Sequence, residues 1–196
     1  QPDSDYVNSQ SVTVKWTGSD NYGIEHYEVK LDSGSWLNVG TSTSHEFTAL
    51  SEGQHTVYVK AVDIANNERI TSKMFVVDVT TPVITITSPE DGSYITTSSV
   101  TISWTYTEDN LDKFEVTLDG VHWIDVGTAT SYTFSNVEEG NYVARVKAYD
   151  KAGNVGEDSV SFTVDYTAPQ VWITEPANNY YTNVTTVTVK WDATDN

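Results

Sequence analysis

The chain has 196 residues, 38% of them hydrophobic, and it contains no cysteine, which excludes disulfides and thiol chemistry. Its 28 acidic and 10 basic side chains give a formal net charge of −18. A chain with this negative charge repels phosphate backbones and anionic lipid headgroups. We therefore expect no nucleic-acid partner and no electrostatic docking on a membrane. Cations are the natural partners, although an acidic surface also simply keeps an exported protein soluble.

Alternating apolar and polar residues predict short β-strands from the start of the chain. The clearest segments in its first part are residues 11–16 (SVTVKW), 26–31 (HYEVKL) and 56–63 (TVYVKAVD). A period of two is typical of a strand with one buried face, and no segment shows a convincing helical period. No apolar run reaches the length of about 18 residues that a membrane-spanning helix needs, so we expect no membrane insertion of this segment.

The middle of the chain contains a complete set of such strands. We expect them near residues 83–87, 100–104, 114–118, 123–126, 132–134, 142–148 and 160–164, and we letter these strands A to G in chain order. On the second of these, Val100, Ile102 and Trp104 share the inward face. Seven short alternating strands separated by frequent turns predict an antiparallel sandwich of two sheets.

The sequence repeats with a period of a small domain. The segment at 11–16 returns at 99–104 and at 186–191, and its tryptophans give spacings of 104 − 16 = 88 and 191 − 104 = 87 residues. A period this long suits an autonomous domain. We therefore predict a first repeat at 1–79 that lacks its strand A, a complete second repeat at 80–166, and strands A and B of a third at 167–196.

The short third segment leaves three possibilities open, because two strands alone bury no core. The segment is disordered, is completed by residues beyond it, or pairs with another chain. In the last case it would donate a strand to a first repeat that lacks one, and self-assembly into a filament would follow.

Several motifs carry a resemblance to a known family. Residues 26–31 and 56–63, the turn at 150–154 (DKAGN) and the linker at 164–169 (VDYTAP) are similar to fibronectin type III and immunoglobulin-like repeats of large prokaryotic cell-surface proteins. The resemblance implies an all-β fold of tandem seven-stranded antiparallel β-sandwiches. It also implies export, a large parent protein made of neighbouring repeats, and frequently calcium at domain junctions, but it leaves the role open.

Acidic residues are expected to gather where one repeat meets the next. Alternating strand directions place the B–C and F–G loops at the pole beside the preceding linker. For the second repeat these segments contribute Asp78, Glu108, Asp109, Asp150 and Asn154. Asp165 and Asp195 would begin the equivalent site at the next junction. Calcium takes six to eight oxygen ligands, which such a cluster offers; the alternative is a set of solvated, turn-forming acids.

Other polar residues have structural interpretations. His55 stands at the start of strand F, where Tyr142 of the second repeat would form a tyrosine corner, so we expect a hydrogen-bonded corner residue and not a metal ligand. Outward positions on neighbouring strands C and F predict two cross-strand ion pairs, Glu28 with Lys60 and Glu115 with Lys147.

Tryptophans are the candidate sugar-binding residues. Trp36 and Trp123 follow the C strand, where the inward or outward phase is uncertain, and Trp172 takes an outward position. An exposed Trp172 fits a carbohydrate platform, a subunit contact or a tolerated surface aromatic. Trp16, Trp104 and Trp191 fall on the inward phase of strand B, which predicts a place in the core.

No arrangement of residues indicates catalysis. The chain lacks a nucleophile elbow, a His-Glu-x-x-His motif and a glycine-rich phosphate loop, so we expect no enzyme in this segment. We predict a non-catalytic structural or adhesive segment of a long extracellular prokaryotic cell-surface protein: an adhesin stalk, a surface-layer protein or a filament. The alternative is an accessory or carbohydrate-binding module of a secreted polysaccharide-degrading enzyme. Under either interpretation a glycan or a cell-surface ligand is a candidate partner.

Overall fold

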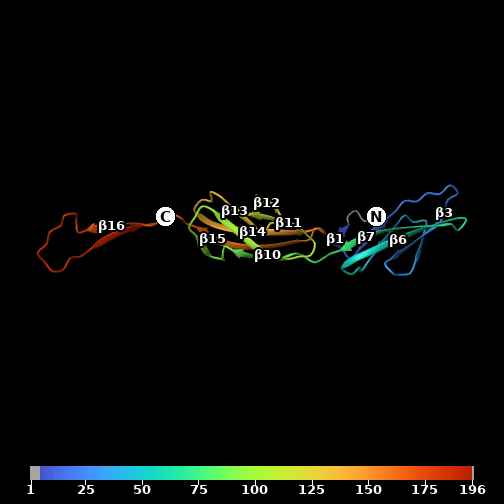
Figure 1. The fold of residues 1–196 in the computed structure, drawn as a ribbon, viewed down its shortest axis with the longest axis horizontal. Coiled ribbons are helices and arrows are strands. Elements are labelled where there is room, and N and C mark those ends of the chain that lie inside the picture. The colour runs from blue at the N-terminus through green and yellow to red at the C-terminus, as the bar shows by residue number, and fades with distance from the viewer. Residues whose placement is uncertain (1–4, 196) are drawn as a thin grey trace.

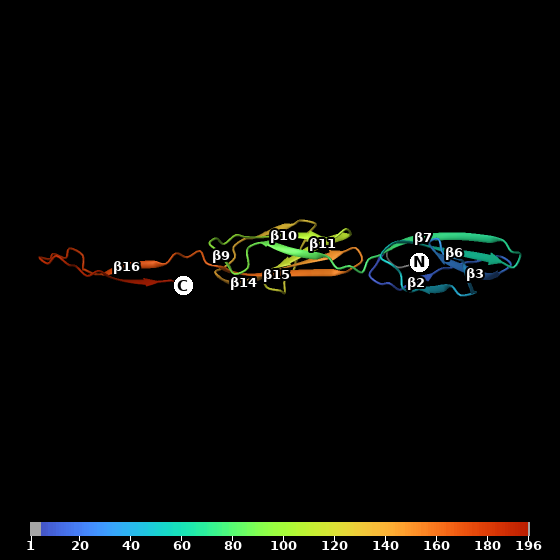
Figure 2. The same ribbon diagram turned by 90° about the horizontal axis from the view of Figure 1, so that it is seen from below.

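The computed structural model describes residues 5–195, and within that range it contains strands, turns and loops but no helix. The described residues accordingly include no helix of the length and apolar character that crossing a membrane requires. Two β-sandwiches and a terminal hairpin follow one another along one long axis (Figures 1 and 2). The all-β fold predicted from the alternation is confirmed.

The first sandwich contains seven strands in two sheets. They are β1 (Tyr6–Val7), β2 (Val12–Lys15), β3 (Ile24–Leu31), β4 (Leu37–Gly40), β5 (Ser44–Phe47), β6 (Gly53–Asp63) and β7 (Glu68–Val77). One sheet has the order β1-β7-β6-β3-β4, and the other pairs β2 with β5. Alternate residues of these strands face inward, so that Val29, Val57 and Phe75 are fully buried between the sheets.

The second sandwich contains eight strands. They are β8 (Val83–Ser88), β9 (Ser93–Ile95), β10 (Val100–Thr107), β11 (Leu111–Thr117), β12 (Ile124–Gly127), β13 (Ser131–Phe134), β14 (Gly140–Asp150) and β15 (Val155–Val164). The sheets have the orders β12-β11-β14-β15-β9 and β13-β10-β8. Ile102 and Trp104 of β10 pack on Phe114 of β11 in one continuous core.

One strand in each sandwich differs from the predicted set. The sequence predicts no strand between residues 87 and 100, yet β9 begins at Ser93, after a cis Ser88–Pro89 bond, and pairs in parallel with β15. The short strand β1 pairs in parallel with β7 in the same way. The first repeat therefore has a counterpart of β9, while residues 5–79 contain no counterpart of β8.

The start of β8 lies unusually close to β15. Gly156 makes this approach possible, because a Cβ atom there would collide with the carbonyl oxygen of Pro82. Further along, the Ile86 N–H donates a hydrogen bond to Asp158 Oδ2 at 2.8 Å. These contacts fix β8 across the opening between the two sheets, beside β10 and β15.

The third segment is a lone hairpin. Strand β16 (Gln170–Glu175) pairs with β17 (Lys190–Thr194), and every residue of both strands is exposed. Trp191, predicted to face a core by its phase, is 64% exposed. That prediction is wrong for the described residues, because no second sheet covers the hairpin.

The predicted corner residues take the expected places. The Tyr142 hydroxyl donates to the Glu138 carbonyl oxygen at 3.0 Å. In the first repeat, His55 Nε2 lies 2.9 Å from the Ser51 carbonyl oxygen, four residues earlier in the same way. His55 is buried at this corner, and its structural role is confirmed.

Candidate functional site: the junction between the two sandwiches

The linker that leaves the first sandwich is fastened to it by backbone and side-chain hydrogen bonds. The Asp78 N–H donates to the Val7 carbonyl oxygen at 2.9 Å. Glu52, in the loop before β6, accepts from the Val79 N–H at 3.1 Å and from the Thr80 hydroxyl at 2.7 Å. The linker therefore leaves the first sandwich in a fixed direction.

Loops of the second sandwich reach back to the same linker. Asn110 Nδ2, in the B–C loop, donates to Asp78 Oδ2 at 2.9 Å, and Asn154 Nδ2, in the F–G turn, donates to the Asp78 carbonyl oxygen at 2.8 Å. The Lys151 amino group lies 5.6 Å from the centre of the Tyr6 ring, a cation–π contact between the two repeats. Asp78 thus has hydrogen bonds to both sandwiches.

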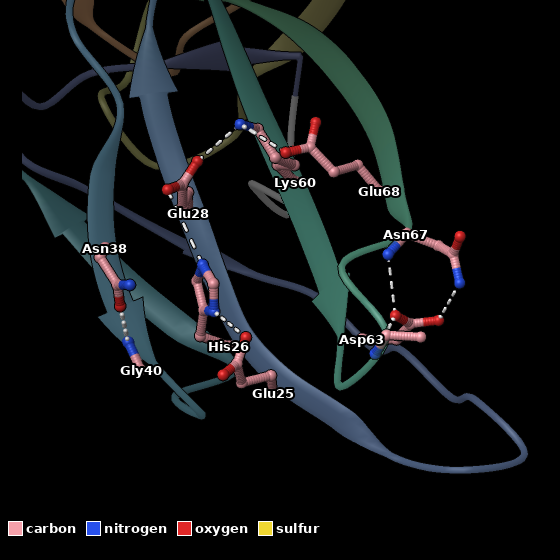
Figure 3. A network of polar contacts seen from close by, with 10 residues as sticks. Glu25, His26, Glu28, Asn38, Gly40, Lys60, Asp63, Asn67 and Glu68 are labelled. Atoms are coloured by element: carbon pink, nitrogen blue, oxygen red, sulfur yellow. Dashed lines mark hydrogen bonds and ion pairs between the residues drawn. The ribbon is translucent and has the colours of Figure 1, made fainter.

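The F–G turn of each repeat is closed by an aspartate and an asparagine. Asn154 donates to Asp150 through its backbone N–H at 2.8 Å and through Nδ2 at 2.7 Å. Asp63 and Asn67 make the same two contacts in the first repeat, each at 2.8 Å (Figure 3). The turn aims its aspartate at a fixed point, so the junction receives Asp150 in a defined place.

Three carboxylates converge at this junction. Asp78, Glu108 and Asp150 each offer an oxygen atom, and these atoms lie within 4.8 Å of one another. Asp78 is 7% exposed and Asp150 is 3% exposed. None of the three forms an ion pair with a basic side chain within residues 5–195. Buried carboxylates are costly unless a cation balances them, so this cluster favours a cation.

The geometry suits a calcium ion. Oxygen ligands sit about 2.3–2.6 Å from Ca²⁺, so ligands on opposite sides of the ion are about 5 Å apart. The spread of 4.8 Å among the three carboxylates fits that limit, and all the donors are hard oxygen atoms. The three carboxylates therefore have the donor atoms and the spacing to hold a metal ion.

The remaining predicted metal ligands occupy other positions. Asn154 lies at the junction and orients Asp150 and the Asp78 backbone, whereas Asp109 is exposed and stands outside the cluster of three. Asp165 repeats the backbone contact of Asp78, with its N–H on the Ile95 carbonyl oxygen at 2.9 Å, and its Oδ1 is buried without a hydrogen-bond partner. Within the described residues, Asp165 and Asp195 join no cluster of three acidic groups.

Sequence reasoning missed two residues of the junction, Asn110 and Glu52. A sequence signal for Glu52 existed, because the Glu-Gly pair that begins at Glu52 returns 87 residues later at Glu139. In the structure, Glu139 accepts a hydrogen bond from the Tyr166 N–H at 2.9 Å. Both linkers are therefore fastened by the same device. Asn110 carries no such signal, since its role depends on the direction of one side chain.

A charged network covers the C and F strands of the first repeat. Lys60 Nζ lies 2.7 Å from Glu28 Oε2 and 3.6 Å from Glu68 Oε1 (Figure 3). The hydrogen bond from Lys60 holds the pKa of Glu28 below its usual value. The predicted cross-strand pair is confirmed here, and it is a structural feature of the sheet.

The prediction of the corresponding ion pair in the second repeat, between Glu115 and Lys147, is wrong. Glu115 lies opposite Lys147 in the register of β11 and β14, but its ion pair is with Lys113, at 2.6 Å. Lys113 is next but one on the same strand and on the same face, and it also binds Asp125 at 2.9 Å. Lys147 instead lies over the ring of Trp123 at 4.1 Å.

Lysines cover the tryptophans whose orientation was uncertain. The Trp36 ring has Lys60 4.7 Å and Lys30 5.1 Å from its centre, and Trp123 has Lys147. These half-buried rings complete cation–π contacts on the sheet and leave less of their faces open for stacking on a sugar. Trp172, on β16, is 45% exposed, but every residue of that strand is exposed, so its outward phase stays a prediction.

Comparison with known families identifies part of the chain. Residues 82–142, which run from the start of β8 into β14, match the family described as Bacterial Ig domain. The match includes strands of both sheets of the second sandwich and the B–C loop that carries Glu108, while β15 and most of β14 lie beyond it.

The curated relatives are large multidomain proteins. The chain is 32% identical over 169 residues to Chitinase A1 of Niallia circulans, covering 81% of this chain and 24% of that protein. It is 31% identical over 215 residues to Exoglucanase B of Cellulomonas fimi, covering 95% and 19%. It is 27% identical over 160 residues to Halomucin of Haloquadratum walsbyi, covering 74% and 2%. The chain thus spans less than a quarter of these relatives.

Solved structures share the fold. The fibronectin(III)-like modules of CbhA from Clostridium thermocellum superpose with a TM-score of 0.54 at 18% identity, covering 81% of this chain and 87% of that one. Murine CEACAM1b superposes with a TM-score of 0.51 at 9% identity, covering 82% and 96%. The predicted resemblance to immunoglobulin-like and fibronectin-like repeats is confirmed at the level of the fold.

Proposed function

We propose that this chain, whose second repeat is a bacterial immunoglobulin-like domain, is a non-catalytic spacer in a longer extracellular protein, and that calcium between its repeats limits bending. The observation that carries the proposal is the junction. Asp78 receives hydrogen bonds from two loops of the second sandwich while its own backbone is fastened to the first. A linker held from both sides sets the direction of one domain relative to the next.

The three carboxylates supply the ligands in this proposal. Asp78 comes from the linker, Glu108 from the B–C loop and Asp150 from the F–G turn. Bound calcium would supply the positive charge that these groups otherwise lack, and so tie three separate segments together. Removing the ion would leave like charges in contact, and we expect the junction to open.

The experiment is a calcium titration of the full chain by calorimetry, combined with small-angle scattering with calcium and with chelator. We expect binding, and a longer and stiffer particle with calcium. Glu108→Gln should weaken binding at least about tenfold, since it removes one charged ligand from the set. The matched control is Asp109→Asn, which changes the adjacent exposed acid. Absence of binding at millimolar calcium, or an equal loss in both variants, contradicts the calcium site.

A spacer without calcium dependence is a distinguishable outcome. If scattering shows an extended particle that chelator leaves unchanged, the linker contacts of Glu52 and Asn110 hold the junction by themselves. If the particle bends freely under both conditions, the spacer function is wrong as well.

Catalysis has no place in this proposal. Chitinase A1 and Exoglucanase B are named as enzymes, but this chain covers only 24% and 19% of their lengths. The immunoglobulin-like sandwich is generally a non-catalytic module that hosts many roles. We assign the chain to a prokaryotic extracellular or cell-surface protein on the strength of these relatives.

The second candidate function is an accessory module of a secreted polysaccharide-degrading enzyme. The names of two relatives, a chitinase and an exoglucanase, favour it. Binding of the full chain to insoluble chitin and cellulose tests it. Retention on either polymer that is lost in Trp172→Ala, but kept in the control Tyr22→Ala, would favour direct glycan binding. Lack of retention favours a spacer that holds other modules apart.

A further inference from the structure

One sheet of the second sandwich carries no charge. Its strands β8, β10 and β13 read VITITS, VTISWTYT and SYTF, without any acidic, basic or histidine residue. In the opposite sheet, β11, β14 and β15 each contain at least one acidic residue. Because the chain as a whole has a net charge of −18, the sheet of β8, β10 and β13 differs sharply from the rest of the surface.

Hydroxyl groups line the outer side of this sheet, which we call the hydroxyl face. The outward positions of β10, from Thr101 to Thr107, are all threonine or serine. Thr133 of β13 pairs with Thr101, and Thr85 of β8 pairs with Thr105. Strand geometry gives this face a length of about 20 Å along β10 and a width of about 10 Å across the three strands. It therefore presents rows of hydroxyl and methyl groups.

Part of these hydroxyls have no partner in the protein. Thr101 Oγ1 and Thr133 Oγ1 lie 2.8 Å apart and bond to each other. By contrast, the side chains of Ser103, Thr107 and Ser131 form no hydrogen bond within residues 5–195. A hydroxyl group both donates and accepts, and it rotates to suit its partner. The face can therefore bind a ligand that itself carries hydroxyl groups.

The hydroxyl face points sideways from the particle. The sandwich before it and the hairpin after it follow along the long axis (Figures 1 and 2), so these neighbours meet the poles of the second sandwich. The strands of the face pair with one another inside that sandwich. A neighbouring repeat on either side consequently leaves the face open.

The first repeat has charges where the second has hydroxyls. In the register of β2 with β5, Lys15 takes the place of Ser103 and Glu46 takes the place of Thr133. The sandwich therefore forms with charged residues at these positions, and its stability does not require hydroxyls there. This difference between the repeats favours a role in binding for the hydroxyl face.

We propose that the hydroxyl face binds a neutral polysaccharide chain that lies along β10. The net charge of the protein repels anionic polymers, so the ligand is uncharged. Sugar units offer hydroxyl groups at their edges and C–H groups on their faces, which match the hydroxyl and methyl groups of threonine. This inference rests on the second candidate function, the accessory module, and gives it a binding surface that does not include Trp172.

Retention of the full chain on insoluble cellulose and chitin tests the proposal. Ser103→Lys with Thr133→Glu copies the two charges of the first repeat and keeps the net charge. It should lower retention about tenfold, the loss expected from one or two hydrogen bonds. The matched control, Asn141→Glu with Thr163→Lys, places the same two charges on the opposite sheet and should leave retention unchanged.

A second variant removes hydroxyls without adding charge. Thr101→Val with Thr133→Val keeps the shape of both side chains and should also lower retention. Urea unfolding of each variant checks that the second sandwich is intact.

Three outcomes overturn the proposal. They are no retention of the wild type on either polymer, equal retention of the charged variant and its control, or self-association of the wild type that the charged variant abolishes while retention stays the same. Retention that is lost in Trp172→Ala but kept in the charged variant supports the accessory module and overturns only this inference. The spacer function is judged separately, by scattering.

Discussion

The corner before strand F keeps the same hydrogen bond in both repeats, although His55 stands in the first repeat where Tyr142 stands in the second. His55 and Tyr142 both reach the carbonyl oxygen four residues earlier. His55 Nδ1 also lies 2.8 Å from Asp32 Oδ2, so both ring nitrogens face acceptors. Burial alone would lower the pKa of His55, but the hydrogen bonds to Asp32 and to the Ser51 carbonyl outweigh it and raise the pKa. The protonated ring is the form that satisfies both neighbours.

This corner predicts a pH-dependent stability for the first repeat. A raised pKa means that the folded state binds the proton more tightly than the unfolded chain, whose histidine titrates near pH 6.5. The stabilisation is fully present below that pH and is lost as the pH rises through the higher folded value. We therefore expect the free energy of unfolding to fall between about pH 6 and 8, measured by urea titration.

His55→Tyr is the variant that isolates this effect. It reproduces the corner of the second repeat without a titrating group, so the slope between about pH 6 and 8 should largely disappear. An unchanged slope in His55→Tyr would show that another group carries the proton linkage.

Gly156 gives a second prediction for a single residue. Because a Cβ atom there meets the Pro82 carbonyl, Gly156→Ala should destabilise the second repeat by about 1–3 kcal/mol. Arg69→Ala, at the equivalent and exposed position of the first repeat, should stay within about 0.5 kcal/mol of the wild type. Urea unfolding of each variant is the measurement. If Gly156→Ala leaves the unfolding midpoint of the second repeat unchanged, β8 moves away from β15 without loss of stability.

At the scale of the strand, one sequence meets three environments. The VTVKW segment or its close relative forms β2, β10 and, in part, β17, but β10 is flanked by β8 and β13, while β2 has β5 alone. Trp104 is consequently buried, Trp16 is half-buried and Trp191 is exposed. Alternation predicts which face of a strand is apolar; it does not reveal whether a second layer covers that face.

The same limit explains which parts of the site were predictable. Loop positions follow from the order of the strands, and this was enough to bring Asp78, Glu108 and Asp150 together. The direction of an amide side chain such as Asn110, or a three-residue strand such as β9, leaves no periodic trace in the sequence. Asp109 lies in the same loop as Glu108 but outside the cluster of three, because neighbouring side chains in a loop need not face the same way.

A core residue of β10 tests the independence of the two sandwiches. Ile102 is fully buried in the second core, and Ile102→Ala should cost that repeat about 2–5 kcal/mol. Because the first repeat has core clusters of its own, its unfolding transition should keep its midpoint. Thr101→Ala, which alters the exposed side of the same strand, is the control. A common shift of both transitions in urea would instead mean that the repeats unfold as one cooperative unit.

For the molecule as a whole, we expect the repeated glutamate contacts to keep the particle straight. Glu52 and Glu139 fasten the two linkers in the same way, 87 residues apart. Glu52→Ala should release the linker between the sandwiches and lower the maximum dimension measured by small-angle scattering. Glu46→Ala, on the exposed side of β5, should not change it. A straight particle in both variants would assign the alignment to Asn110 and Asn154 instead.

The parallel pairs formed by β1 with β7 and by β9 with β15 have a mechanical consequence. In each sandwich one short strand near the N-terminal side is bonded alongside the last strand, which leads into the next linker. When tension acts on the two ends of the chain, parallel strands are pulled in opposite directions along their length. All the hydrogen bonds between the two strands then bear the force at the same time, in shear, and do not break one after another. Each repeat thus has its most rupture-resistant geometry on the path that a pulling force follows.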